Sequence, residues 1–273
     1  MPIRSHLGRP LDIRLRSNLI LIAIVLITGA VAIALWVAGK PAELIFFAPA
    51  QAFVIWALMR EIDPDHDWSA LVAGAAAGAW VLTGGPYISV LAIGALMLAA
   101  RLVTESTGRR PLAIDLVAMA LAAVIAFTVT GWVAAFGLAI ALYLDDRFAP
   151  ESRRLQIGIS ALTAVGATVV ASLTGAFPHT LPGLSPYVAV TSGLLALLLV
   201  AREPVAPISQ VDARHKAFVS EERLHASRSL VGILVFGMSL LIGRDAEGLV
   251  PVLAALGLAV IANEVERIRR RRG

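Results

Sequence analysis

A chain of 273 residues in which 58% of the residues are hydrophobic and only 15% are charged is too apolar for an ordinary water-soluble domain. The sequence contains no cysteine, which excludes disulfides, thiolate metal sites and cysteine nucleophiles. The formal net charge is +4, but the basic residues lie between apolar runs and form no basic face, so we expect a membrane protein and no nucleic-acid partner.

The N-terminal part of the chain combines a basic arm with a first apolar run. Residues 1–18 carry four arginines among apolar side chains, and we expect them to lie at the membrane interface. The run at 19–39 is long enough to cross a bilayer and is followed by no small-residue cleavage site, which favours a membrane span over a cleaved signal peptide. Gly39-Lys40-Pro41 predicts a turn, after which 42–59 returns to the starting side.

Two later apolar stretches are too long to be single spans. The stretch 68–100 has about 33 residues, which as one helix would be roughly 50 Å long against a hydrocarbon core of roughly 30 Å. Gly84-Gly85-Pro86 supplies a turn that divides it. The turn at Gly131-Trp132 in 112–144 is weaker, but a single span there would place Arg109 and Arg110 on the opposite side of the membrane from Arg147, Arg153 and Arg154, so we divide it too. The sequence therefore predicts an all-α integral membrane bundle of about ten short transmembrane helices arranged as five hairpins, with spans near 19–39, 42–59, 68–84, 87–103, 112–130, 132–144, 155–174, 187–201, 229–243 and 249–263.

Basic residues favour one side of this arrangement. With both termini in the cytoplasm, 21 of the 23 Lys and Arg residues lie on the cytoplasmic side, and only Lys40 and Arg244 lie outside. This positive-inside pattern predicts cytoplasmic termini, a basic C-terminal tail at 264–273 and a multi-pass protein of the inner (plasma) membrane.

The longest predicted cytoplasmic segment is 202–228. Ser209 and Asp212 resemble a short capping box, so we expect an amphipathic helix from there to the next span. Its basic face predicts contact with anionic headgroups of the inner leaflet, and docking of a protein partner is the alternative. The side chains expected to make either contact are Arg214, Lys216 and Arg223.

Polar side chains inside the predicted spans are few, and they are candidates for a solute path or for coupling. Asp115 lies about one turn inside its helix, where an ionisable group is costly and favours a functional role. The alternative is a first-turn helix charge near the interface. Thr163 on one helix, with Thr191 and Ser192 on the next, could line a weakly polar path unless these side chains bond to their own helices.

Small residues spaced four apart predict one close helix contact. Ala70, Gly74 and Gly78 share a face of the helix at 68–84, where they would let a neighbouring backbone approach. We expect tight packing there and no cofactor groove.

Alternating aspartates in the loop after 42–59 are the candidate metal ligands. Asp63, Asp65 and Asp67 could offer oxygens to a hard divalent cation such as Mg²⁺. The loop lacks the central glycine and the closing glutamate of a helix-loop-helix calcium site. The alternative is that these carboxylates neutralise neighbouring arginines in a solvated loop. We expect no cofactor unless the protein is an enzyme, in which case the ion would be Mg²⁺.

Three functions fit this pattern. The first is a transporter or channel for a small neutral or lipid-like solute, which short spans with little mass outside the membrane favour. The second is a non-catalytic membrane subunit of a larger complex that docks through 202–228. The third is a membrane-embedded lipid or isoprenoid enzyme with a carboxylate-rich cytoplasmic site. We expect the first of these.

Overall fold

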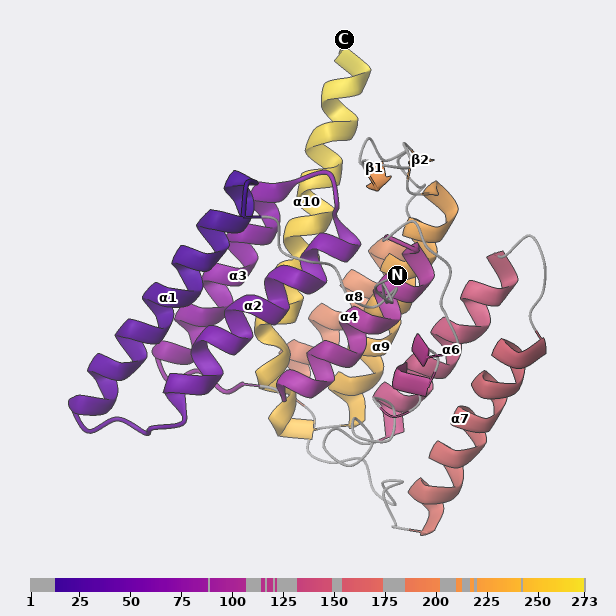
Figure 1. Cartoon of the computed structure of the whole chain (residues 1–273), viewed down its shortest axis with the longest axis horizontal. Helices are drawn as coiled ribbons and strands as arrows, with labels where there is room; N and C mark the ends of the chain where they lie inside the picture. Colours follow the sequence, from indigo (N-terminus) through magenta and orange to yellow (C-terminus); the bar gives the residue numbers. More distant parts are fainter. Residues whose placement is uncertain are drawn as a thin grey trace.

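A computed structural model gives the structure of the chain, and apart from one short pair of strands the described part is helical (Figure 1). The all-α class predicted from composition is confirmed for this part. The described residues are 13–87, 89–106, 114–115, 117–119, 121, 132–148, 154–173, 185–201, 210–212, 217–218, 220–241 and 243–272.

The helices lie close to the predicted spans. The bounds of α1 to α4, α7 and α8 agree with the prediction within three residues, whereas the span expected at 112–130 lies mostly outside the described residues. The elements are α1 (Arg16–Val37), α2 (Leu44–Ile62), α3 (Asp67–Leu82), α4 (Val90–Thr104), α6 (Trp132–Phe148), α7 (Arg154–Leu173), α8 (Pro186–Ala201), α9 (Glu221–Leu241), the 3-10 helix η1 (Gly243–Leu249) and α10 (Val250–Arg272).

Among the described residues, four helical segments are long and apolar enough to cross a membrane by length and composition. The segments that qualify are Arg16–Val37, Leu44–Ile62, Glu221–Leu241 and Ala246–Arg269. Other apolar helices, such as α3, α4 and α8, have 15 or 16 residues, fewer than the roughly 20 that a perpendicular span requires. The structure supports a membrane protein, and the ten-span arrangement stays a prediction.

Two of the three turns predicted from glycine are present in described loops, and the third, at Gly131, lies outside the described residues. Gly39 and Gly84 both have φ of +87°, a left-handed conformation that glycine adopts without steric cost. The indole Nε1 of Trp80 donates to the main-chain oxygen of Pro86 at 2.8 Å and so closes the loop between α3 and α4. The helices on either side of the Gly39 turn, α1 and α2, pack against each other, whereas α3 and α4, on either side of the Gly84 turn, do not.

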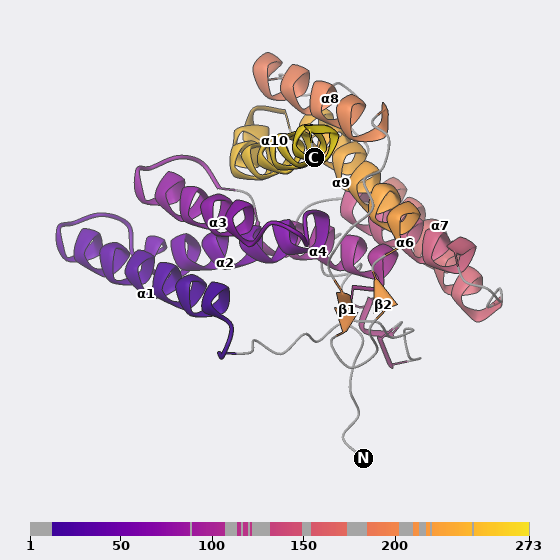
Figure 2. The same ribbon diagram turned by 90° about the horizontal axis from the view of Figure 1, so that it is seen from above.

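Helix α4 occupies the centre of the bundle. It packs against α2, α6 and α9, and Figure 2 shows it between the group α1–α3 and the pair α6–α7, with α8–α10 beside them. Helix α10 packs against α2, α3 and α8, so the last helix of the chain closes the bundle against the first group. Chain segments far apart in sequence therefore meet around α4.

The small-residue face of α3 makes the close contact that its spacing predicts. An added Cβ at Gly74 would lie 2.8 Å from the main-chain oxygen of Ala52, and one at Gly78 would lie 2.7 Å from Cγ2 of Thr28. Ala70 is fully buried on the same face. Atoms of α1 and α2 lie too close to these glycines to leave room for a side chain, so the predicted tight packing is confirmed.

The helix expected over 209–228 is wrong in its first half. Strands β1 (Gln210–Asp212) and β2 (Ala217–Phe218) pair antiparallel there, and α9 begins only at Glu221 and runs unbroken into the predicted span at 229–243. Two acidic residues, Glu221 and Glu222, stand in the first turn of α9, where they favour the positive end of the helix dipole. That start signal is stronger than the capping box proposed twelve residues earlier.

Candidate functional site: a buried charge network

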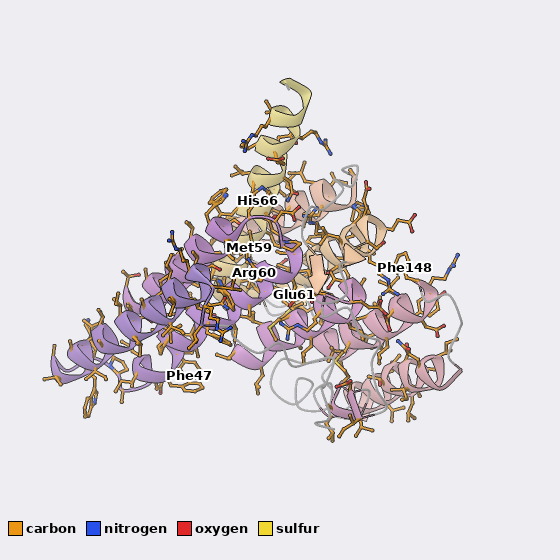
Figure 3. All side chains as sticks on the ribbon, turned by 45° about the horizontal axis from the view of Figure 1, so that its top comes forward. Phe47, Met59, Arg60, Glu61, His66 and Phe148 are labelled. Carbon is orange, nitrogen blue, oxygen red and sulfur yellow. The ribbon has the colours of Figure 1, made fainter. Side chains whose placement is uncertain are left out.

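Three buried arginines connect the ends of several helices. They come from the last turn of α4 and the first two turns of α9, and they bind carboxylates at the C-terminal ends of α2 and α6. Figure 3 shows Met59, Arg60, Glu61 and His66 grouped where α2 ends, with Phe47 farther away near the start of that helix. We use the name charge network for six buried side chains, Glu61, Asp63, Arg101, Asp145, Arg223 and Arg228.

The first part of the charge network joins α2 to α4. Oε1 of Glu61 accepts from both Nε and Nη2 of Arg101, at 2.8 and 2.6 Å. The two side chains are 1% and 8% exposed, so little water screens the pair. Oε2 of Glu61 is buried as well, and it has no hydrogen-bond partner among the described residues. One half of a buried carboxylate thus keeps an open acceptor.

The second part joins α9 to α4 and α6. Nη1 of Arg223 donates to Oδ1 of Asp145 at 2.9 Å and to the main-chain oxygen of Val103 at 3.1 Å. The guanidinium also lies over the ring of Phe148, 5.6 Å from its centroid, which is a cation–π distance. Gln156 on α7 donates to the other oxygen of Asp145 at 2.5 Å. Both carboxylate oxygens of Asp145 therefore accept hydrogen bonds, one from α9 and one from α7.

The third part joins α9 to α2 and α10. Nε of Arg228 donates to the main-chain oxygen of Ile62 at 2.6 Å, which satisfies one of the carbonyls left open at the end of α2. Nη2 of the same side chain donates to Oδ1 of Asn263 at 3.1 Å and lies 4.0 Å from Asp63. One arginine on α9 therefore connects the C-terminal end of α2 to the middle of α10.

Asp63 is fully buried just after α2 and is held by the start of α3. Nδ1 of His66 lies 2.8 Å from Oδ1, and the hydroxyl of Ser69 donates to Oδ2 at 2.8 Å. Burial raises the pKa of this carboxyl above the ordinary value of 3.8, and the contacts with His66, Ser69 and Arg228 oppose that rise. The hydroxyl of Ser69 also donates to the main-chain oxygen of His66 at 2.7 Å, whereas in a nucleophilic triad the hydroxyl bonds to the imidazole ring, so the trio is not such a triad.

The aspartates proposed as metal ligands do not converge. Asp63 points into the protein with both oxygens engaged, while Asp67, which is more than half exposed, pairs with Arg60. Within the described part of the chain no group of three His, Asp or Glu side chains is placed to hold a metal ion. The alternative interpretation, in which loop carboxylates neutralise neighbouring arginines, agrees better with these contacts, although Asp63 is buried and not solvated.

The residues proposed for a solute path are placed apart. The hydroxyl of Thr163 on α7 bonds back to its own helix at Ile159, and α7 packs only on α6 in the described structure. On α8, Thr191 is exposed, and Ser192 is buried with its hydroxyl 2.7 Å from that of Ser239 on α9. The predicted path between α7 and α8 is therefore not assembled here.

Of the four remaining predicted site residues, the structure describes two, Asp115 and Arg223. Asp115 is buried, at 2% exposure, so its carboxyl is not at a solvated helix end. Arg214 and Lys216 lie outside the described residues. Arg223, expected at the lipid surface, is buried in the charge network instead, because α9 begins before it and turns it toward α4 and α6.

The charge network itself was missed from sequence, although a signal was present. Arg101 stands inside an apolar run, with Ala100 before it and Leu102 after it, a position that a solvated loop residue would not occupy. Asp145 directly follows a predicted span in the same way. An ionisable residue at such a place needs a buried partner, and that requirement could have directed attention to these helix ends.

No protein-family model, curated protein or solved structure matches this chain.

Proposed function

We propose that the chain is a multi-pass protein of the inner (plasma) membrane that transports a small neutral or lipid-like solute, with the charge network closing the cytoplasmic end of the bundle. The observation that carries this proposal is the set of buried pairs Glu61–Arg101 and Asp145–Arg223, together with the bonds of Arg228. They tie the ends of α2, α4, α6 and α9 to one another and to the middle of α10.

Buried ion pairs are a costly way to hold a bundle together. Removing two charges from water costs several kcal/mol per ion, and well-packed apolar side chains often do as well or better. Charged pairs have one advantage, because water can solvate both partners when the helix ends separate. A closure built from Glu61–Arg101 and Asp145–Arg223 can therefore open without exposing apolar surface, as alternating access requires.

The two ends of the bundle differ in the burial of their contacts. At the end opposite the charge network, Tyr87 donates to Glu43 across 44 residues of sequence at 2.9 Å, and this bond is exposed. The pairs of the charge network are buried. Such a difference is expected of a transporter whose helices are joined by buried contacts at the closed end and by weaker, exposed contacts at the other end.

The other two functions have less support in the geometry. A magnesium-dependent enzyme needs carboxylate oxygens free to bind the ion, and those of Asp63 and Asp145 are occupied by protein donors. A docking subunit was expected to use Arg223 as a surface contact, and this side chain is buried. Transport needs neither an accessible carboxylate cluster nor an exposed basic helix.

The proposal can be tested by locking the closed end. Ser227 on α9 donates to the main-chain oxygen of Ala100 on α4 at 3.3 Å, and both residues are fully buried. The double variant Ala100→Cys/Ser227→Cys, in a chain with no other cysteine, would be reconstituted in liposomes and cross-linked by oxidation. Osmotic swelling with small uncharged solutes, and movement of a labelled lipid between leaflets, would measure flux.

Reduced protein should carry at least one of these probes faster than empty liposomes, and oxidised protein should carry none. Each single-cysteine variant serves as the matched control and should be insensitive to oxidation. Equal flux from oxidised protein, with the cross-link verified by loss of free thiols, would contradict closure at this end. Flux no higher than that of empty liposomes for every probe would contradict transport of this solute class.

A further inference from the structure

The second half of α10 carries an apolar stripe with nothing packed on it in the described structure. Figure 1 shows this part of the helix extending beyond the other helices toward the C-terminus. Ile261, Val265 and Ile268 are 57%, 60% and 44% exposed. They are spaced by four and three residues, so they share one face of the helix.

This stripe extends back along the helix with the same spacing. Exposed Ala254 and half-buried Leu258 precede Ile261 at intervals of four and three, which gives a repeat of 4-3-4-3 from Ala254 to Ile268. Such a repeat is the heptad seam of a coiled coil, with Leu258 and Val265 at a positions and the others at d. The opposite face, with Leu256 and Ala259, is buried against the bundle.

Lipid does not account for the end of the stripe. Val265 and Ile268 lie beyond the span predicted at 249–263, in the last part of the candidate segment Ala246–Arg269, where charged side chains that require water or headgroups lie among them. Exposed apolar surface there costs about 25 cal/mol per Å², so a partner that covers it gains that energy. The neighbouring charged residues are Glu264, Glu266, Arg267 and Arg269.

Charges beside the seam identify the partner. In the heptad register Glu264 falls at g and Arg269 at the following e, the two positions that pair between parallel helices. Two copies inserted in the same orientation are related by an axis along the membrane normal, which makes their α10 helices parallel. Glu264 of one copy would then face Arg269 of the other, twice by symmetry. Within its own helix, Glu264 lies 4.0 Å from Arg267, an exposed pair of the kind that contributes little to stability.

We propose that the seam from Ala254 to Ile268 binds the same seam of a second copy of this chain, forming a parallel homodimer through α10. The inference does not depend on what the protein transports. Because the chain has no native cysteine, single cysteines can map the contact in membranes that contain the full-length protein. Val265→Cys and Ile268→Cys lie on the seam, and Glu266→Cys and Arg267→Cys are matched controls on other faces of the same turn.

Mild oxidation should give a cross-linked dimer for both seam variants and little or none for the two controls. No dimer from either seam position, or equal dimer from all four, would overturn the proposal. The first of these results is the one expected if only lipid covers the stripe.

Charge reversal separates a specific dimer from an accidental encounter. In the Ile268→Cys background, Glu264→Arg and Arg269→Glu each place like charges across the seam and should reduce cross-linking several-fold. The double reversal should restore it, because opposite charges face each other again. Failure of the double reversal to recover the dimer, in protein that remains monodisperse, would rule out the proposed register.

Discussion

Two nitrogens of Arg101 bind one oxygen of Glu61, at 2.8 and 2.6 Å, although the residues lie 40 positions apart in the chain. The second oxygen of Glu61 is buried and has no partner among the described residues. This pair joins the end of α2 to the end of α4, and its contribution to stability can be measured without a transport assay.

Removing one member of the pair should cost much more than removing both. Arg101→Met leaves the Glu61 carboxylate buried without its cation, and we expect a loss of about 3–5 kcal/mol in the free energy of unfolding. Glu61→Leu/Arg101→Met should recover most of that loss. Unfolding in lipid–detergent micelles measures both, and equal losses in the single and double variants would contradict a paired, buried arrangement.

Asp63 should make stability depend on pH in a direction opposite to that of a paired surface aspartate. Its pKa is raised above 3.8 by burial, so the folded protein binds a proton more tightly than the unfolded chain does. Its contribution to stability is therefore largest below pH 3.8 and falls as pH rises through the folded-state pKa. Subtracting the pH profile of Asp63→Asn from that of the native protein isolates this effect. A difference that grows with pH would show that the pKa is lowered instead.

Substitution by alanine should have opposite effects on the free energy of unfolding at Gly74 and at Gly94, each of which lies inside a helix. Gly74→Ala places a Cβ 2.8 Å from the backbone oxygen of Ala52, which cannot rotate away, and we expect a loss of about 1–3 kcal/mol. Gly94→Ala is the matched control, since nothing lies within 4 Å of its added Cβ and alanine favours the helix by about 0.5–1 kcal/mol. Thermal unfolding should separate the two variants, and similar effects would contradict the close contact of α2 and α3.

The hydrogen bond between the hydroxyls of Ser192 and Ser239 should contribute only modestly to the free energy of unfolding. The two oxygens lie 2.7 Å apart between α8 and α9, but each hydroxyl is also placed to bond to its own helix. A double-mutant cycle with Ser192→Ala and Ser239→Ala should give a coupling of about 0.6 kcal/mol, as is usual for such bonds in membrane proteins. A coupling near zero would show that both hydroxyls bond only within their helices.

Helices and turns could be predicted because their signals are local. The apolar run of α1, the turn at Gly84 and the packing face with Gly74 each depend on residues close together in sequence. The charge network depends on which helix ends meet, and its bonds join residues up to 166 positions apart, as for Arg228 and Ile62. From sequence alone, the positions of Arg101 and Asp145 indicate that each needs a buried partner but do not identify that partner, and Arg223 is indistinguishable from a solvated charge that flanks a span.

The start of α9 illustrates the same limit. The predicted amphipathic helix was expected to lie on the membrane surface and to end where the next span begins. Instead α9 runs unbroken from Glu221 into that span, and Arg223 and Arg228 lie on its buried side. Arg223 is therefore not placed at the lipid surface.

Accessibility of a single cysteine at Ser227 tests most directly whether the charge network closes the cytoplasmic end. Ser227 is fully buried, and Glu222, one turn earlier on the same helix, is exposed. In inside-out vesicles a membrane-impermeant maleimide should label Ser227→Cys slowly and Glu222→Cys rapidly, and adding Glu61→Gln should accelerate labelling only at Ser227→Cys. Labelling of Ser227→Cys that is unchanged by Glu61→Gln, or that occurs only from the outer face, would contradict the proposed closure.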